Sequence, residues 1–168
     1  TSYSKAMEST SIDFSKSQWG RIHSFQSASH SELSSYYNDK GKIKKLVNKA
    51  ICHAEEALKV CPAHTFPYEW GLAMINKGVG FSKLIGIQDK ALENAMNCWN
   101  LVVDELDIES FPYITGLAQN NLLVHSVDTE LHSIEELQKQ YESFLRVYSK
   151  STSPLLWASA KNSLGTLI

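Results

Sequence analysis

The sequence of 168 residues is poor in cysteine and proline, and it has no long apolar run. Three unevenly placed cysteines cannot form a disulfide framework, which favours a reducing compartment such as the cytoplasm. No stretch approaches the roughly 18 consecutive apolar residues of a membrane span, so we expect no membrane-spanning segment. Neither sign of charge dominates, because 16 basic and 18 acidic residues give a net charge of −2. This balance argues against nucleic acid as the main partner.

Hydrophobic residues make up 43% of the chain and charged residues 20%, as in folded soluble proteins. The length favours one compact domain or one short array of repeats. The chain starts at Thr1 without an initiator Met or an apolar signal core, which suggests an excised fragment or a processed chain. Twelve of the first 35 residues are serine. We therefore expect residues 1–10 to be a flexible lead-in and residues 11–168 to form a single helical domain.

Three of the four prolines open similar segments, which indicates internal repeats. Phe66–Ala73 matches Phe111–Ala118, and Ser153–Ala160 is a looser copy. Within these segments, Pro67, Pro112 and Pro154 follow one another at intervals of 45 and 42 residues. A period in the forties is typical of repeats that consist of two helices.

A second helix is predicted before each of these prolines. The positions 20, 17, 13, 9 and 6 residues before the proline are apolar in all three copies, and steps of 3 or 4 place them on one helix face. These positions are Val47, Ala50, Ala54, Leu58 and Cys61 in the first copy, Leu92, Ala95, Trp99, Val103 and Leu106 in the second, and Ile134, Leu137, Tyr141, Leu145 and Tyr148 in the third.

Small residues recur on the helix that follows each proline. Ala73, Ala118 and Ala160 are predicted to face another helix closely, with Trp70 and Trp157 partly buried beside them. We predict an all-α fold of seven helices at residues 12–37, 42–61, 67–84, 89–107, 112–125, 133–149 and 154–168. The repeat units are residues 42–86, 87–130 and 131–168. In the N-terminal helix that precedes them, the predicted apolar stripe consists of Trp19, Ile22, Phe25, Leu33, Tyr36 and Tyr37.

The first helices carry Trp, then Gly or Ala, then Ala, and the second helices are rich in Ala. This pattern resembles tetratricopeptide-type repeats. The closing run Pro154-Leu155-Leu156-Trp157-Ala158 … Asn162-Ser163-Leu164-Gly165 resembles the longer bacterial variants of that family. The resemblance covers about residues 42–168, although the common period is about 34 residues and Thr115 stands where Trp is expected. It implies a right-handed α-solenoid of about seven antiparallel helices whose first helices line a concave groove.

The resemblance also implies a non-catalytic scaffold that binds a peptide or a partner domain in that groove. Two alternatives remain: the docking or sensing arm of a larger bacterial effector such as a protease, and a nucleic-acid-binding repeat. The second alternative would use Lys40, Lys42, Lys44, Lys45 and Lys49.

Carried over by position, the candidate partner-binding residues lie eight or nine residues after each proline. They are Ile75, Asn76, Asn120, Asn121, Asn162 and Ser163. Leu164 and Ile168 are further candidates, because their helix lacks a partner helix within the chain. We expect them to form an apolar edge that meets another domain of the parent chain, a binding partner or a second copy.

No catalytic, metal or cofactor site is predicted. Cys52, His53, Cys61 and His64 have residue types that bind zinc. However, a helix places Cys52 and Cys61 on opposite faces, about 13 Å apart. We therefore expect cysteine to pack as a buried apolar residue, and we do not expect an enzyme.

Overall fold

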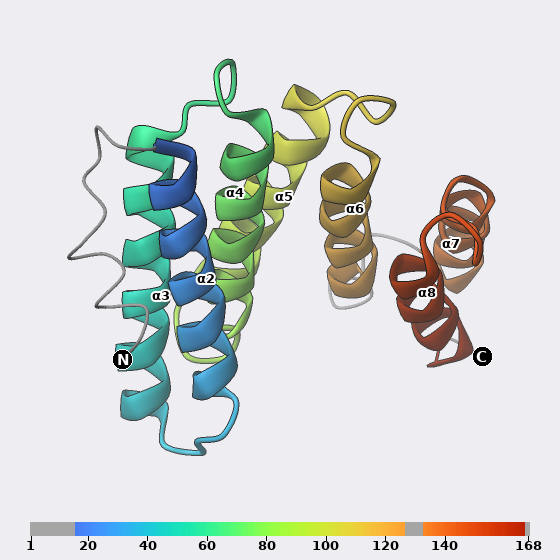
Figure 1. The fold of residues 1–168 in the computed structure, drawn as a ribbon. Helices are drawn as coiled ribbons and strands as arrows, with labels where there is room; N and C mark the ends of the chain where they lie inside the picture. Colours follow the sequence, from blue (N-terminus) through green and yellow to red (C-terminus); the bar gives the residue numbers. More distant parts are fainter. Residues whose placement is uncertain (1–15, 127–132, 167–168) are drawn as a thin grey trace.

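The computed structural model describes residues 16–126 and 133–166, and within these ranges the chain forms seven helices and no strand (Figure 1). The all-α fold is thus confirmed, and the predicted helices match the observed ones to within a few residues. The predicted lead-in at residues 1–10 and the predicted helical residues 12–15 and 167–168 lie outside the described residues. No described helix is both long enough and apolar enough to cross a membrane. The helices are α2 (Lys16–Ser34), α3 (Lys40–Val60), α4 (Pro67–Ser82), α5 (Ala91–Glu105), α6 (Pro112–Ser126), α7 (Ile134–Val147) and α8 (Pro154–Thr166).

Local chemistry explains where the helices begin. Pro67, Pro112 and Pro154 are the first residues of α4, α6 and α8. Proline suits this place because its fixed φ is helical and its missing N–H would have no partner there. Helix α3 begins where the Asp39 side chain accepts a hydrogen bond from the Lys42 N–H. Helix α7 begins with a reciprocal capping box between Ser133 and Glu136.

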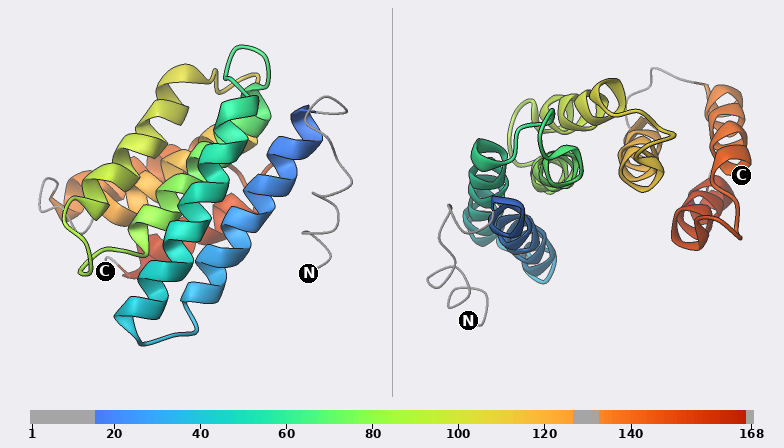
Figure 2. Two further views of the ribbon diagram at one scale, coloured as in Figure 1. Left: turned by 90° about the vertical axis from the view of Figure 1, so that its left-hand side faces the viewer. Right: turned by 45° about the horizontal axis from the view of Figure 1, so that its top comes forward.

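Three packing relations recur along the chain. We call α2, α4, α6 and α8 the first helices, and α3, α5 and α7 the second helices. Each second helix packs against the first helix before it and the first helix after it, and successive first helices pack against one another. In the right-hand view of Figure 2, the first helices form the inner row of an arc and the second helices form the outer row.

The same close contact recurs at three glycines, one on each of α2, α4 and α6. Each glycine faces the residue directly after the next second helix and the third residue of the next first helix. A methyl group on Gly71 would lie 2.5 Å from the Cγ2 atom of Ile114, and one on Gly116 would lie 2.6 Å from the Cδ1 atom of Leu156. The contacts are Cys61 and Glu69 at Gly20, Leu106 and Ile114 at Gly71, and Tyr148 and Leu156 at Gly116.

The predicted apolar stripe of the second helices forms much of the core. The positions 17, 13 and 6 residues before each proline are buried in all three copies, and the position 9 residues before is half-buried. Ile134 is the exception, since this first residue of α7 is 58% exposed. Ala73, Ala118 and Ala160 are fully buried, as predicted, and Trp70 and Trp157 are half-buried. The repeated stripe is therefore a packing face.

Helix α2 turns the later part of its apolar stripe outward, contrary to the pattern of the other helices. Phe25 is 51% exposed and Leu33 is 44% exposed, and Tyr36 follows the helix at 77% exposure. The face that packs against α3 and α4 consists instead of Gly20, His23, Ser24, Gln26, Ser27, Ser31 and Ser34. Small side chains on this face let the backbones of neighbouring helices approach. Trp19 and Ile22 are half-buried, and the Trp19 ring lies beside His23.

Candidate interaction surface

The neighbours of α4 define which of its sides remain open. Glu69 bonds to α2, and a side chain on Gly80 would meet Ile51 of α3. Side chains on Gly71 and Gly78 would meet α6 and α5. Because each residue turns the helix by about 100°, these contacts leave an open side between α2 and α6, away from the second helices.

Tyr68, Leu72 and Val79 occupy this open side of α4. The equivalent residues of α6 are Tyr113, Leu117 and Val124. Leu155 of α8 has the same place as the two tyrosines, one residue after the proline. We call these seven residues the inner face, because they lie on the side of the first helices that faces away from the second helices. The first helices form the inner row of the arc (Figure 2).

Large side chains are exposed at the same repeat position of the inner face. Tyr68 is 37% exposed, Tyr113 is 47% exposed and Leu155 is 75% exposed. Val124 is exposed as well, and Leu72 and Leu117 are half-buried. Successive first helices therefore present a row of apolar and aromatic side chains to solvent.

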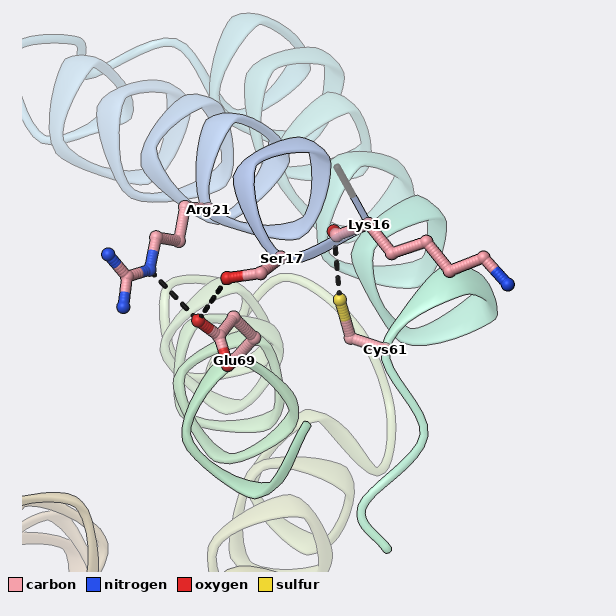
Figure 3. A network of polar contacts seen from close by, with 5 residues as sticks. All are labelled: Lys16, Ser17, Arg21, Cys61 and Glu69. Carbon is pink, nitrogen blue, oxygen red and sulfur yellow. Dashed lines mark hydrogen bonds and ion pairs between the residues drawn. The ribbon is translucent and has the colours of Figure 1, made fainter. Parts of the chain in front are cut away.

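A polar network borders this face at α2 (Figure 3). The Ser17 hydroxyl donates to Glu69 Oε1 at 2.6 Å, and Arg21 Nε donates to the same oxygen at 2.9 Å. Burial alone would raise the pKa of Glu69, but the hydrogen bonds from Ser17, its own backbone and Arg21 hold that pKa below its ordinary value. The Arg21 guanidinium also lies 5.6 Å from the centre of the Tyr68 ring. Glu69 thus fixes a cation beside the inner face.

The predicted partner-binding residues are divided between the core and the surface. Ile75 is only 4% exposed and belongs to the central apolar cluster, and Asn120 is 8% exposed. Asn76 and Asn121, one residue further on, are half-buried, and Asn76 Nδ2 donates to the carbonyl of Ser24 at 2.9 Å. One residue is a rotation of about 100°, which separates the core side from the open side.

Among the predicted residues of α8, Asn162 is more exposed than its equivalents Ile75 and Asn120, which are buried. Asn162 is exposed and Ser163 is half-buried. Leu164 is half-buried and packs against the cluster that contains Tyr141 and Phe144, so it is not the exposed apolar edge that the sequence suggested. Ile168 lies outside the described residues. The sequence interpretation also missed the row at Tyr68, Tyr113 and Leu155, although a large residue directly after each proline was visible as a signal.

Two of the three cysteines are buried thiols with raised pKa values. Cys61 is fully buried, as predicted, and burial raises its pKa to about 11. Burial likewise raises the pKa of Cys98 to about 11, so both thiols stay protonated near neutral pH. Cys52 is exposed. In the described part of the chain, no three His, Cys, Asp or Glu side chains are placed to hold a metal ion.

Two other surface features lie apart from the inner face. Lys40, Lys42, Lys44, Lys45 and Lys49 are exposed on the first turns of α3. A groove of about 450 Å³ lies between α6 and α7, lined in part by Leu122, Phe144 and Val147. Leu122 lies about 140° around α6 from Leu117, so this groove opens on a different side of the helix.

Comparisons with known proteins find no relative for this chain. No protein-family model matches it, and neither a curated protein nor a solved structure does. A function therefore rests on the chain's own surface, and the inner face is the strongest feature of that surface.

Proposed function

We propose that this chain is a protein-interaction scaffold, a right-handed α-solenoid of tetratricopeptide-type repeats that binds a peptide or partner domain along its inner face. The recurrent packing of first and second helices supports the solenoid. So does the recurrent close approach at Gly20, Gly71 and Gly116. In such an array each repeat contacts only its neighbours, and equivalent residues line up along one face.

The observation that carries the proposal is the exposed row of Tyr68, Tyr113 and Leu155. Contiguous exposed apolar side chains mark interaction sites, and tyrosine is enriched among residues that dominate binding. Packed helices lie about 8–10 Å apart, so three successive first helices span roughly 20 Å. This length suits an extended segment of about six residues. The expected partner is thus a short segment with two or three large apolar side chains.

The same face would serve if the chain is the docking arm of a larger effector. The bound segment would then belong to another domain of that effector, and the contacts would be unchanged. The chemistry of the partner, and not its origin, is what the inner face determines.

Selection of random peptides displayed on phage tests this function directly. Peptides are enriched on the unaltered chain and then measured against two double variants. Tyr68→Ser with Tyr113→Ser alters the inner face, whereas Leu101→Ser with Ile134→Ser alters two exposed apolar residues of the second helices. We expect the inner-face variant to weaken binding at least tenfold, because truncation of a central aromatic residue costs 1 kcal/mol or more. The control variant should bind normally.

Circular dichroism must first show that both variants keep the helical signal of the unaltered chain. Equal binding of the enriched peptides to both variants would place the binding site elsewhere. A selection that enriches no peptide would contradict a peptide-binding groove.

A further inference from the structure

Helix α2 is held by a seam that contains few apolar contacts. Its buried residues are small or polar, and several of their polar atoms have no hydrogen-bond partner. A buried polar atom without a partner loses the hydrogen bond that it would make to water. Undocking α2 therefore returns these atoms to water, which favours release. The unpartnered atoms are Nε2 of His23, Oε1 of Gln26 and the hydroxyl oxygens of Ser24, Ser27 and Ser31.

Three histidines cluster within this seam. His23 Nδ1 and His53 Nδ1 are 3.2 Å apart, so one ring donates a single proton to the other. The centre of the His53 ring lies 5.3 Å from the centres of the His23 and His30 rings. The centre of the Trp19 ring lies 4.8 Å from the centre of the His23 ring. One added proton places a cation in the buried seam, and a second would also break the hydrogen bond and place two cations in contact.

The charged groups around the pair do little to stabilise an added proton on either imidazole. His53 is acted on by His23, His30, Glu56 and Lys49, all of which lie on α2 and α3. Among these, Glu56 is the one carboxylate, and it also pairs with Lys59.

Helix α4 packs against both α2 and α3, and its charged groups that face them are engaged elsewhere. Glu69 binds Arg21 and Lys77 binds Glu55. Lys83, the residue directly after α4, donates from Nζ to the Ser35 hydroxyl. These groups offer the two imidazoles no counter-charge.

Burial, followed by the charges of His23 and His30, lowers the pKa of His53 to about 4, and burial also lowers the pKa of His23. A released helix would restore the ordinary value of 6.5. The docked state therefore binds fewer protons than the released state. The stabilisation that the docked state gains from neutral His53 is fully present above about pH 6.5 and is lost as the pH falls towards 4.

We propose that α2 is an acid-releasable helix: protonation of the His23–His53 pair separates α2 from α3 and uncovers the faces of α3 and α4 that α2 covers. Release also removes Arg21 from the edge of the inner face. The release itself needs no bound partner, so it can be tested independently of the proposed function.

Cys61 reports the position of α2. Its Sγ donates to the carbonyl of Lys16 at 3.3 Å, and Gly20 lies directly against it. Cys98 is buried in the central apolar cluster, to which α2 contributes none of the described residues. Labelling of Cys61 with Cys98 protected therefore indicates release of α2 alone, whereas labelling of both indicates global unfolding.

The experiment uses a Cys52→Ser background, because Cys52 is exposed and would react in any state. A pyridyl disulfide reagent that remains reactive in acid is applied at pH 7 and pH 5, and mass spectrometry locates the label. Each rate is divided by that of an unstructured cysteine peptide at the same pH. If only the pKa of His53 changes, from 6.5 in the released state to about 4 in the docked state, the relative labelling rate of Cys61 should rise about 20-fold from pH 7 to pH 5. The rate of Cys98 should stay unchanged.

Two variants assign the effect to the seam. His53→Gln should flatten the rise in Cys61 labelling, since glutamine does not titrate. His64→Gln, at an exposed histidine outside the helices, should keep the rise.

If His53→Gln itself opens the seam at pH 7, NMR titration of the histidines in the unaltered chain tests the proposal instead. Midpoints of His23 and His53 below 6.5 support the proposal, and midpoints at or above 6.5 overturn it. Equal protection of Cys61 at both pH values, or joint labelling of Cys61 and Cys98, also overturns it.

Discussion

Gly71 lies against Ile114 so closely that a Cβ atom on Gly71 would be 2.5 Å from the Cγ2 atom of Ile114. The two residues belong to successive first helices, α4 and α6. Gly116 and Leu156 repeat the contact between α6 and α8. Because Cγ2 branches directly from the Cβ atom of isoleucine, it cannot easily rotate out of the way. The missing side chain at Gly71 thus sets how closely the first helices approach.

Gly71→Ala should therefore destabilise the fold. We expect a loss of about 1–2 kcal/mol, because overpacking costs roughly 1–3 kcal/mol and alanine regains up to about 1 kcal/mol of helix propensity. Gly165→Ala in α8 is the matched control, since no atom lies within 4 Å of that Cβ position. Urea unfolding followed by circular dichroism measures both. Equal changes of the same sign would show that the close approach does not limit packing.

Glu69→Gln tests the charged contact between α2 and α4. We expect a loss of about 1 kcal/mol at neutral pH, because two hydrogen bonds to a carboxylate become weaker and Arg21, 53% exposed, remains partly solvated. The lowered pKa of Glu69 gives stability that is present above its ordinary value of 4.5 and lost as the pH falls through the folded value. The melting temperatures of variant and parent should thus converge in acid. A gap that persists unchanged at pH 3 would contradict this.

Glu69→Ile asks whether the charge is needed at this position. Ile114 and Leu156 occupy the equivalent place in the next two copies. Replacing a buried ionic contact with an apolar one is often neutral or stabilising. We expect Glu69→Ile to be at least as stable as Glu69→Gln in urea unfolding at neutral pH. A larger loss for isoleucine would mean that the seam at α2 does not accept the apolar packing of the later copies.

Much of the fold follows from local features of the sequence. A proline such as Pro112 sets where a helix starts, and steps of 3 and 4 between apolar residues set which side is buried. Both signals act within one or two helical turns, so no distant contact is needed to interpret them. This explains why the helix bounds and the buried positions of the second helices were predictable.

The orientation of α2 and the burial of Glu69 were not predictable in this way. Helix α2 carries both a serine face and an apolar face, and periodicity alone assigns the apolar face to the core. The close approach of Cys61, directly after α3, to Gly20 shows that the small residues face inward. The burial of the predicted binding residues was hard to predict for a related reason. A shift of one position, as between Ile75 and Asn76, turns a side chain by about 100°.

Ala118→Leu tests the buried contact of α6. Ala118 has no exposed surface and belongs to the central cluster. A leucine there should overpack the cluster and lower the free energy of unfolding by about 1–3 kcal/mol. Ala158→Leu in α8 adds the same volume at an exposed position and should change stability by less than about 0.5 kcal/mol. Thermal denaturation of the two variants should separate them, and an unchanged midpoint for Ala118→Leu would rule out tight packing at this site.

The last helix offers Leu155, and not Leu164, as its exposed apolar residue. Leu164 packs against the cluster of Tyr141 and Phe144, so Leu164→Glu should lower the free energy of unfolding by about 1–3 kcal/mol. Leu155 is 75% exposed, and Leu155→Glu should change the free energy of unfolding by less than about 0.5 kcal/mol. Urea unfolding at low protein concentration measures both. Light scattering across concentrations then tests the surface itself, because self-association through α8 should vanish with Leu155→Glu while the fold persists. Loss of stability with Leu155→Glu would instead place this leucine in the core and remove it from the inner face.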